Sequence, residues 1–241
     1  MSQLWLDLGN TRLKYWLMNG ECLLDHDARL HLQAPAELLL GLSDKFMRLK
    51  PEFIGISSVL GKEINAQVTE ILDTMGIAYE FANVNAAHPV LQSRYAPDQL
   101  GVDRWLQMLG VTKPAVNQCV IGCGTAMTLD VISDGVHLGG YIFPNARLQR
   151  QALYAGTQQI DVQTGNIDST ALATTTLDAV NHGILLSIVG AIHELHRAYP
   201  AHQFIATGGD APIIARHLSF DVTIHQDLVL RGLKRYFAGR F

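Results

Sequence analysis

Two short stretches of this chain have the residue types and spacing of phosphate-binding turns. The first follows an apolar run near the N-terminus and reads Asp7-Leu8-Gly9-Asn10-Thr11-Arg12-Leu13-Lys14. The second lies about halfway along the chain and reads Gly122-Cys123-Gly124-Thr125-Ala126. Each predicts a strand, a tight turn with glycine and a hydroxyl residue, and a second strand that ends at a hairpin signal, Asn19-Gly20 or Asp134-Gly135. Glycine permits close backbone approach to a ligand, so one such turn in each half suits a clamp on a phosphate chain.

The polar residues of the first stretch have defined places on its two strands. The leucines at positions 4, 6 and 8 point to one face of the first strand, and Asp7 points to the other. A carboxylate there, beside a glycine turn, is placed to hold Mg²⁺ through water, while turn N–H groups and the Thr11 hydroxyl can bind phosphate oxygens. Lys14 on the second strand adds a point charge. The alternative, from these residues alone, is an ordinary hairpin in which Asp7 caps the turn.

A third glycine turn, Thr207-Gly208-Gly209-Asp210, lies between a predicted strand at 204–206 and a predicted helix at 212–217. A Gly-Gly turn lets a flat base lie against the backbone and the helix N-terminus. The three turns, in this order, resemble the phosphate-1, phosphate-2 and adenosine motifs of the actin-like ATPase and sugar kinase superfamily. The resemblance implies a duplicated actin-like (ribonuclease H-like) α/β fold, with two similar halves around a nucleotide cleft, and it implies Mg-ATP as ligand. The residues that the resemblance implies as ATP contacts are Asp7, Leu8, Gly9, Asn10, Thr11, Arg12, Leu13, Lys14, Gly124, Thr125, Gly208 and Gly209.

Three further motifs narrow the resemblance to one family. Gly101-Val102-Asp103-Arg104, with Tyr95 a short distance before it, is similar to the Gly-x-Asp-Arg signature of type III pantothenate kinases. The stretch from Gly139 to Pro144 and the helix start from Thr176 to Gly183 also resemble that family, in the right order. The resemblance implies an ATP-dependent kinase of pantothenate, the first step toward coenzyme A, and a homodimer with the substrate site near the subunit interface. Two alternatives stay open: a nucleotide-dependent regulatory module of the same fold, and a kinase of another small alcohol.

The family also implies roles for the residues of its signature. Asp103 is implied as the general base toward a primary alcohol, since phosphoryl transfer needs an oriented base more than a strong one. Arg104 is implied to pair with the substrate carboxylate, where its planar fork suits two oxygens. The implied pantothenate contacts are Tyr95, Gly101, Val102, Asp103, Arg104 and Thr176. From the residues alone, Asp103 could instead only favour a helix N-terminus, with Arg104 in solvent.

One residue departs from the family pattern. The second phosphate motif of the family begins with an Asp that is assigned to a monovalent cation, K⁺ or NH₄⁺, and Gly122 stands at that position here. Glycine has no carboxylate, so the cation requirement that the family implies is in doubt for this chain.

The elements that must position these motifs alternate between strands and helices. Helices are predicted at 36–49, 63–75, 101–111, 148–154, 176–199, 212–217 and 228–237. Single strands are predicted between them at 53–59, 77–82, 204–206 and 222–224, and successive strands joined by turns within 119–142. Such alternation favours parallel strands covered by helices. Residues 83–100 are predicted to form a loop over a site. The domains are expected at 1–115, with the first phosphate motif and the Gly-x-Asp-Arg signature, and at 116–241, with the other two motifs.

Composition sets the remaining limits. The 241 residues are 48% hydrophobic and 17% charged, as in a soluble globular protein. A net charge of -4 without a Lys/Arg run argues against nucleic acid as a partner, and no apolar stretch reaches the roughly 20 residues that span a membrane. Cys22, Cys119 and Cys123 form no paired motif, which agrees with a reducing, cytoplasmic setting and with no structural metal site.

Overall fold

The structure is a computed structural model that describes residues 2–157 and 159–240. The chain forms two compact units. Unit 1 comprises the described residues up to Pro89, together with Tyr95–Val111 and the residues from Leu228 onward. Unit 2 comprises Val90–Arg94 and Thr112–Asp227.

The two units contain sheets with the same strand order. The unit 1 sheet has the order β3-β2-β1-β4-β5. The unit 2 sheet, read in the same direction, has the order β6-β9-β8-β7-β10-β11, in which β6 (Gln92–Ser93) is an additional edge strand. In each, three consecutive antiparallel strands are followed by two strands that add in parallel on the other side of the first. The strands are β1 (Ser2–Leu8), β2 (Arg12–Asn19), β3 (Cys22–Leu30), β4 (Phe53–Ser58), β5 (Tyr79–Phe81), β7 (Gln118–Cys123), β8 (Ala126–Ser133), β9 (Val136–Pro144), β10 (Gln203–Gly208) and β11 (Val222–Ile224). The repeated order is the duplication that the two phosphate motifs predict.

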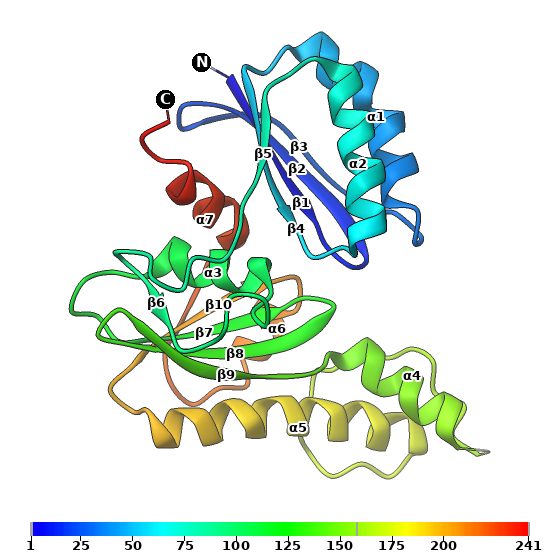
Figure 1. The fold of residues 1–241 in the computed structure, drawn as a ribbon. Helices are drawn as coiled ribbons and strands as arrows, with labels where there is room; N and C mark the ends of the chain where they lie inside the picture. Colours follow the sequence, from blue (N-terminus) through cyan, green and yellow to red (C-terminus); the bar gives the residue numbers. More distant parts are fainter. Residues whose placement is uncertain (1, 158, 241) are drawn as a thin grey trace. The chain divides into compact units, whose positions relative to one another are not determined.

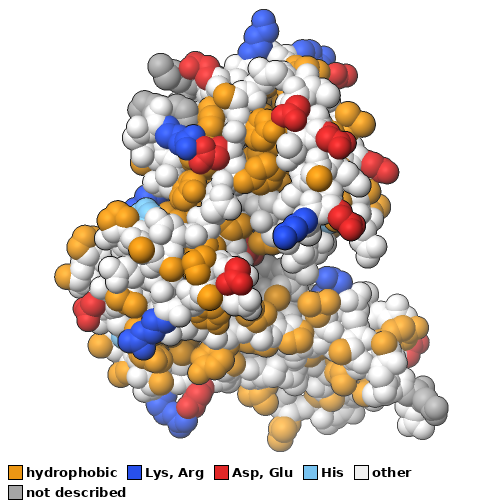
Figure 2. All heavy atoms as spheres, viewed as in Figure 1, with side chains coloured by type: hydrophobic (Ala, Val, Ile, Leu, Met, Phe, Trp, Pro, Cys, Tyr) orange, Lys and Arg blue, Asp and Glu red, His pale blue; other side chains and the backbone are white. Residues whose placement is uncertain are grey.

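In unit 1, the side chains of β1 point alternately to the two faces of the sheet, and both faces are packed. The leucines at 4, 6 and 8 are buried in a core with α1 (Pro35–Leu49) and α2 (Lys62–Met75), which cover one face of the sheet (Figure 1). Acidic side chains gather over the outer surfaces of these two helices (Figure 2), as expected for amphipathic helices. Trp5 lies on the other face, where its ring stacks on Phe237 with centroids 5.9 Å apart. Asp7 shares that second face, as the strand period predicts.

The two units do not correspond to a single division of the chain between residues 115 and 116, because the C-terminal helix belongs to unit 1. Helix α7 (Leu228–Tyr236) packs against α3 (Val102–Val111) in unit 1. The helices cross closely, because a Cβ atom at Gly232 would lie 2.1 Å from the carbonyl oxygen of Leu106. A helix expected within 116–241 therefore completes the unit that contains the Gly-x-Asp-Arg signature.

Unit 2 is built around one long helix. The buried core joins alternate residues of β7 and β8 to the apolar side of α5 (Thr176–Ala198), with α6 (Ala211–Ala215) packed beside it. Helix α4 (Ala146–Gly156) precedes α5 and contacts it. Among the described residues, no helix is long and apolar enough to cross a membrane.

The segment expected as a loop at 83–100 contains a short strand. Strand β6 (Gln92–Ser93) pairs in parallel with β9 and so belongs to the unit 2 sheet. Tyr95, two residues after the end of β6, belongs to unit 1. The chain therefore passes through unit 2 immediately before the substrate motif.

Candidate active site

The first phosphate turn connects β1 to β2 and has a buried carboxylate at its base. Asp7 is 8% exposed and accepts a hydrogen bond from Ser57 Oγ at 3.1 Å. Lys14 is the direct partner of Asp7 across the antiparallel pair, so both side chains lie on one face. The N–H of Gly9 donates to the carbonyl of Arg12 at 3.0 Å, which closes the turn. A carboxylate, a half-buried lysine and turn N–H groups fit a magnesium-bound phosphate.

In unit 2 the second phosphate turn and the adenosine turn lie against each other. Strands β7 and β10 are parallel neighbours, and Cys123 pairs with Gly208 at their carboxyl ends. Gly208 has φ of 103°, and a Cβ atom there would lie 2.1 Å from the carbonyl oxygen of Cys123. Only glycine permits this approach. Burial raises the pKa of Cys119 and Cys123 to about 12, so both thiols are neutral and pack as small apolar groups.

A cavity of about 560 Å³ opens in unit 2 next to the adenosine turn. Asp210 lines it together with side chains of α4 and α6, including Arg150 and Ile213. Burial lowers the pKa of Arg150, and its guanidinium donates to Asn181 Oδ1 at 2.7 Å and to the carbonyl of Gly165 at 2.8 Å. The lining combines two isoleucines with several charged and polar side chains, so the cavity can contact both apolar and polar parts of a ligand.

The candidate general base lies in the first turn of α3. Asp103 is half-buried, and its Oδ1 accepts the backbone N–H of Arg104 at 2.8 Å. A Cβ atom at Gly101 would lie 2.7 Å from the same oxygen. A side chain at position 101 would therefore displace the Asp103 carboxylate from the position that it occupies here.

Arg104 and Tyr95 form the second part of the signature in unit 1. Arg104 lies in the first turn of α3 and is 4% exposed, and its Cζ lies 5.5 Å from the centre of the Tyr95 ring. This burial is inconsistent with an arginine that simply extends into solvent. Thr176 belongs to unit 2, where it is the exposed first residue of α5, after a capping hydrogen bond from the N–H of Asp178 to Thr175 Oγ1. Within unit 1 the structure thus brings Tyr95, Asp103 and Arg104 together.

A buried network that the sequence did not predict anchors β6. His137 Nε2 lies 2.9 Å from Asp130 Oδ1, and its Nδ1 lies 3.0 Å from Ser93 Oγ. His137 is fully buried and Asp130 is 1% exposed. These residues come from β9, β8 and β6, so the network ties the segment before Tyr95 to the sheet of unit 2. The sequence signal is weak: one ionisable residue on each of two largely apolar strands.

The comparisons with known proteins agree with the motifs. The model of the type III pantothenate kinase family matches residues 3–198. A type III pantothenate kinase of Psychrobacter arcticus is 56% identical over 236 residues, 97% of each chain, and one of Acinetobacter baumannii is 46% identical over 240 residues, 99% of this chain and 98% of the other.

Solved structures share the fold. A Campylobacter jejuni protein proposed to be a Baf family transcriptional activator matches with a TM-score of 0.63 and 20% identity, over 98% of each chain. MreB5 of Spiroplasma citri bound to ADP matches with a TM-score of 0.58 and 11% identity, over 99% of this chain and 96% of the other. The duplicated sheets therefore have the actin-like ATPase and sugar kinase fold. With the family model and two full-length relatives in agreement, this chain belongs to the type III pantothenate kinase family.

Proposed function

We infer that this chain transfers the γ-phosphoryl group of ATP to the hydroxyl group of pantothenate, which gives 4'-phosphopantothenate in the first step of coenzyme A biosynthesis. The observation that carries the site assignment is the arrangement at the start of α3. There Asp103 lies in the space left by Gly101, next to Arg104, which is buried beside Tyr95. A carboxylate next to a buried guanidinium suits a substrate that has both a reacting hydroxyl and a carboxylate.

In the proposed reaction, the pantothenate hydroxyl oxygen forms a bond to the γ-phosphorus while the bond from that phosphorus to the bridging oxygen of ADP breaks. The hydroxyl proton passes to Asp103. The transition state of such a transfer is loose, so the protein contributes mainly position and charge. The backbone N–H of Arg104 donates to the Asp103 carboxylate at 2.8 Å. The Asp103 side chain is therefore already ordered, and it loses little conformational entropy when pantothenate binds. Arg104, with Tyr95, Gly101, Val102 and Thr176, is assigned to pantothenate.

The ATP contacts are assigned to the three glycine turns. The first phosphate turn, with Thr11 and Lys14, and the second, with Gly124 and Thr125, are proposed to bind phosphate oxygens. Asp7 is proposed to hold Mg²⁺ through water, since its buried carboxylate is oriented by Ser57; the ion supplies charge neutralisation of the phosphates. The 560 Å³ cavity, which Asp210 of the adenosine turn lines, is proposed to accept the adenosine, with Gly208 and Gly209 of the same turn as its backbone contacts. Because ATP is the donor, we place the reaction in the cytoplasm.

The test is release of ADP by the purified protein with Mg-ATP, measured with and without pantothenate. We expect release that depends on pantothenate, with formation of a product one phosphoryl group heavier. Other small alcohols serve as controls for the acceptor. ATP binding without turnover on any acceptor would favour the regulatory module, and turnover on a different alcohol would reassign the substrate.

A weak response to monovalent cations is expected from Gly122. This residue stands in β7 where the corresponding strand of unit 1 has Asp7, and its partners in the ladders are Thr128 and Thr207. Hydroxyls and backbone carbonyls can bind K⁺, but a formal charge at contact distance is worth several kcal/mol before desolvation is subtracted. We therefore expect shallow activation by K⁺ or NH₄⁺ that does not saturate in the low millimolar range, and a steeper response in Gly122→Asp if the added side chain fits.

The measurement is initial rate against K⁺ at constant ionic strength, with a bulky organic cation as the inert salt. The control is Asp134→Asn, which changes a carboxylate at the exposed end of the β8–β9 hairpin. Tight, saturable activation of the unmodified protein at low millimolar K⁺ would show that neutral ligands replace the missing carboxylate.

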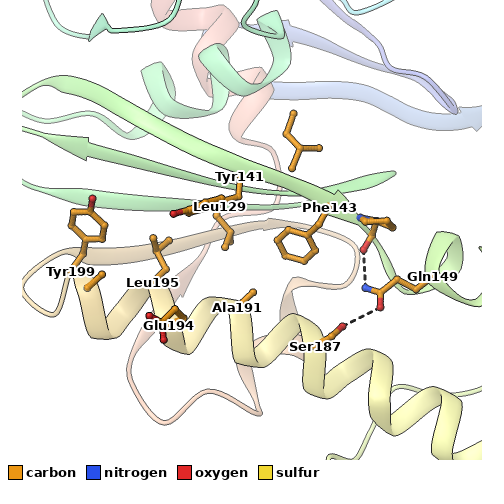
Figure 3. Close-up of a pocket in the computed structure, with 12 residues that line it drawn as sticks. Leu129, Tyr141, Phe143, Gln149, Ser187, Ala191, Glu194, Leu195 and Tyr199 are labelled. Atoms are coloured by element: carbon orange, nitrogen blue, oxygen red, sulfur yellow. Dashed lines mark hydrogen bonds between the residues drawn. The ribbon is translucent and has the colours of Figure 1, made fainter.

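A homodimer is proposed to form through an apolar groove of unit 2. The groove has a volume of about 860 Å³ and lies between β9 and α5, lined by Phe143, Ala191 and Leu195 (Figure 3). Tyr141 and Ile142 at its edge are 63% and 62% exposed. Large apolar side chains gathered at one groove are typical of an interface. A second copy is the proposed occupant because the family implies a dimer and a two-fold interface places the same surface on both partners.

We expect sedimentation of the unmodified protein at about 53 kDa, twice the chain mass of 26.5 kDa. Ile142→Asp is expected to shift it to the monomer, because the proposed interface would then bury an unpaired charge in place of an apolar side chain. Leu40→Asp, on the 57% exposed Leu40 of α1 in unit 1, is the matched control and is expected to stay dimeric. A fully active monomer of the unmodified protein at micromolar concentration would contradict the proposal.

A further inference from the structure

A buried histidine contacts the backbone of the first phosphate turn. His31 follows β3 and is 6% exposed. Its Nε2 lies 2.9 Å from the carbonyl oxygen of Gly9, and its Nδ1 accepts the backbone N–H of Gln33 at 3.2 Å. Because a carbonyl only accepts and a backbone N–H only donates, these two contacts select the neutral ring with its proton on Nε2. The backbone N–H of His31 also donates to the carbonyl of Thr11 at 3.2 Å. His31 therefore contacts two carbonyls of the same turn.

An asparagine makes the same contact in unit 2. Asn145 follows β9, is 8% exposed, and donates from Nδ2 to the carbonyl oxygen of Gly124 at 2.9 Å. Its Oδ1 accepts the N–H of Leu148 at 2.9 Å, which caps α4. Gly9 and Gly124 hold corresponding places in the duplicated sheets, and β3 and β9 are the corresponding third strands. Each unit thus has one buried side chain, directly after its third strand, that donates to the carbonyl of the turn glycine.

These contacts fix the direction of the N–H group that follows each carbonyl. A peptide unit is planar and trans, so its C=O and N–H point in opposite directions. No described peptide bond is cis. With the Gly9 carbonyl directed to His31, the N–H of Asn10 points away from it, and Asn10 is exposed. The N–H of the half-buried Thr125 is set in the same way by Asn145. Rotation of either peptide would present a carbonyl, which repels phosphate, in place of a donor.

We propose that His31 and Asn145 are paired positioning residues that keep the backbone N–H groups of Asn10 and Thr125 directed at the phosphates of ATP. The proposal rests on the function proposed for the two turns. The ligand class is a nucleoside polyphosphate, and the predicted signature is a change in ATP affinity without a change in pantothenate affinity.

The first experiment replaces His31. His31→Leu removes both ring contacts, whereas His31→Gln retains an amide N–H at the place of Nε2. We expect the KM for ATP to rise about three- to tenfold in His31→Leu, the usual range for one lost hydrogen bond, with the KM for pantothenate unchanged and His31→Gln close to the unmodified protein. If His31→Leu fails to fold, His31→Asn gives the same test, since it keeps an acceptor for Gln33 but lacks the reach to Gly9.

The second experiment separates the two contacts of Asn145. Asn145→Ser keeps a side-chain oxygen that can cap α4 but lacks the amide N–H that reaches the Gly124 carbonyl. Asn145→Asp also keeps the cap and places a carboxylate oxygen against the Gly124 carbonyl. We expect the KM for ATP to rise about three- to tenfold in the serine variant and further in the aspartate variant, with little change in melting temperature.

Asp7→Asn distinguishes failure of this inference from failure of the proposed function. If Asp7→Asn raises the KM for ATP while His31→Leu and Asn145→Asp leave it within about twofold, the positioning role is wrong and the phosphate role of the turns stands. If all three variants leave ATP kinetics unchanged, the turns do not bind the phosphates. An equal rise in both KM values without rescue by His31→Gln would show a general structural role and overturn the proposal.

Discussion

Asp103→Asn is expected to lower kcat by at least about 10²-fold while leaving the KM for ATP nearly unchanged. The substitution keeps the size of the side chain, and its amide oxygen can still accept the N–H of Arg104 in the first turn of α3. Only the ability to take a proton from the pantothenate hydroxyl is lost. The measurement is steady-state kinetics with both substrates varied, together with a melting temperature to show that the fold is retained.

Asp98→Asn is the matched control for this substitution. Asp98 is an exposed carboxylate a few residues earlier in the same segment, so its replacement makes the same change in net charge. We expect kcat to stay within about twofold of the unmodified protein. If Asp103→Asn turned over as fast as Asp98→Asn, Asp103 would lose its role as the base and would be a residue of the helix start.

Local sequence signals predicted most of the elements because each signal acts within a few residues. Pro35 begins α1, Gly76 with φ of 63° ends α2, and Gly20 with φ of 58° makes the first hairpin turn. The strand period placed Asp7 on the face opposite the leucines, and the buried contact of Asp7 with Ser57 agrees with that assignment. The duplicated fold was predicted from motif order and is confirmed by the repeated strand order of the two sheets.

Features that depend on contacts distant in sequence were not predicted. Strand β6 has only two residues and exists because β9, more than forty residues later, offers its edge. Helix α7 joins unit 1 through a close crossing that only the three-dimensional position of Gly232 reveals. No local sequence pattern marks His31 or Asn145, because each contacts a carbonyl that is distant in sequence. The separation is 22 residues for His31 and 21 residues for Asn145. The duplication makes them visible, since the same contact recurs in both units.

Arg104→Lys is expected to raise the KM for pantothenate by about ten- to a hundredfold, the range for a charge-assisted bidentate contact reduced to a point charge. Arg104 is 4% exposed beside Tyr95, so a lysine there keeps the charge but loses the planar fork that matches two carboxylate oxygens. The KM for ATP is expected to stay nearly constant. Arg94→Lys, at the exposed Arg94 of the same loop, is the matched control and is expected to change neither constant.

Pantothenate amide separates a contact with the substrate carboxylate from a structural role of Arg104. The amide has no charge for the guanidinium to bind, so the unmodified protein is expected to use it poorly. The amide already lacks the interaction that Arg104→Lys removes. The substitution is therefore expected to lower kcat/KM for the amide little further. Comparison of kcat/KM for acid and amide in both proteins gives the coupling between the side chain and the carboxylate. Equal losses for acid and amide would mean that Arg104 acts through packing against Tyr95, and the carboxylate of pantothenate would then need another partner.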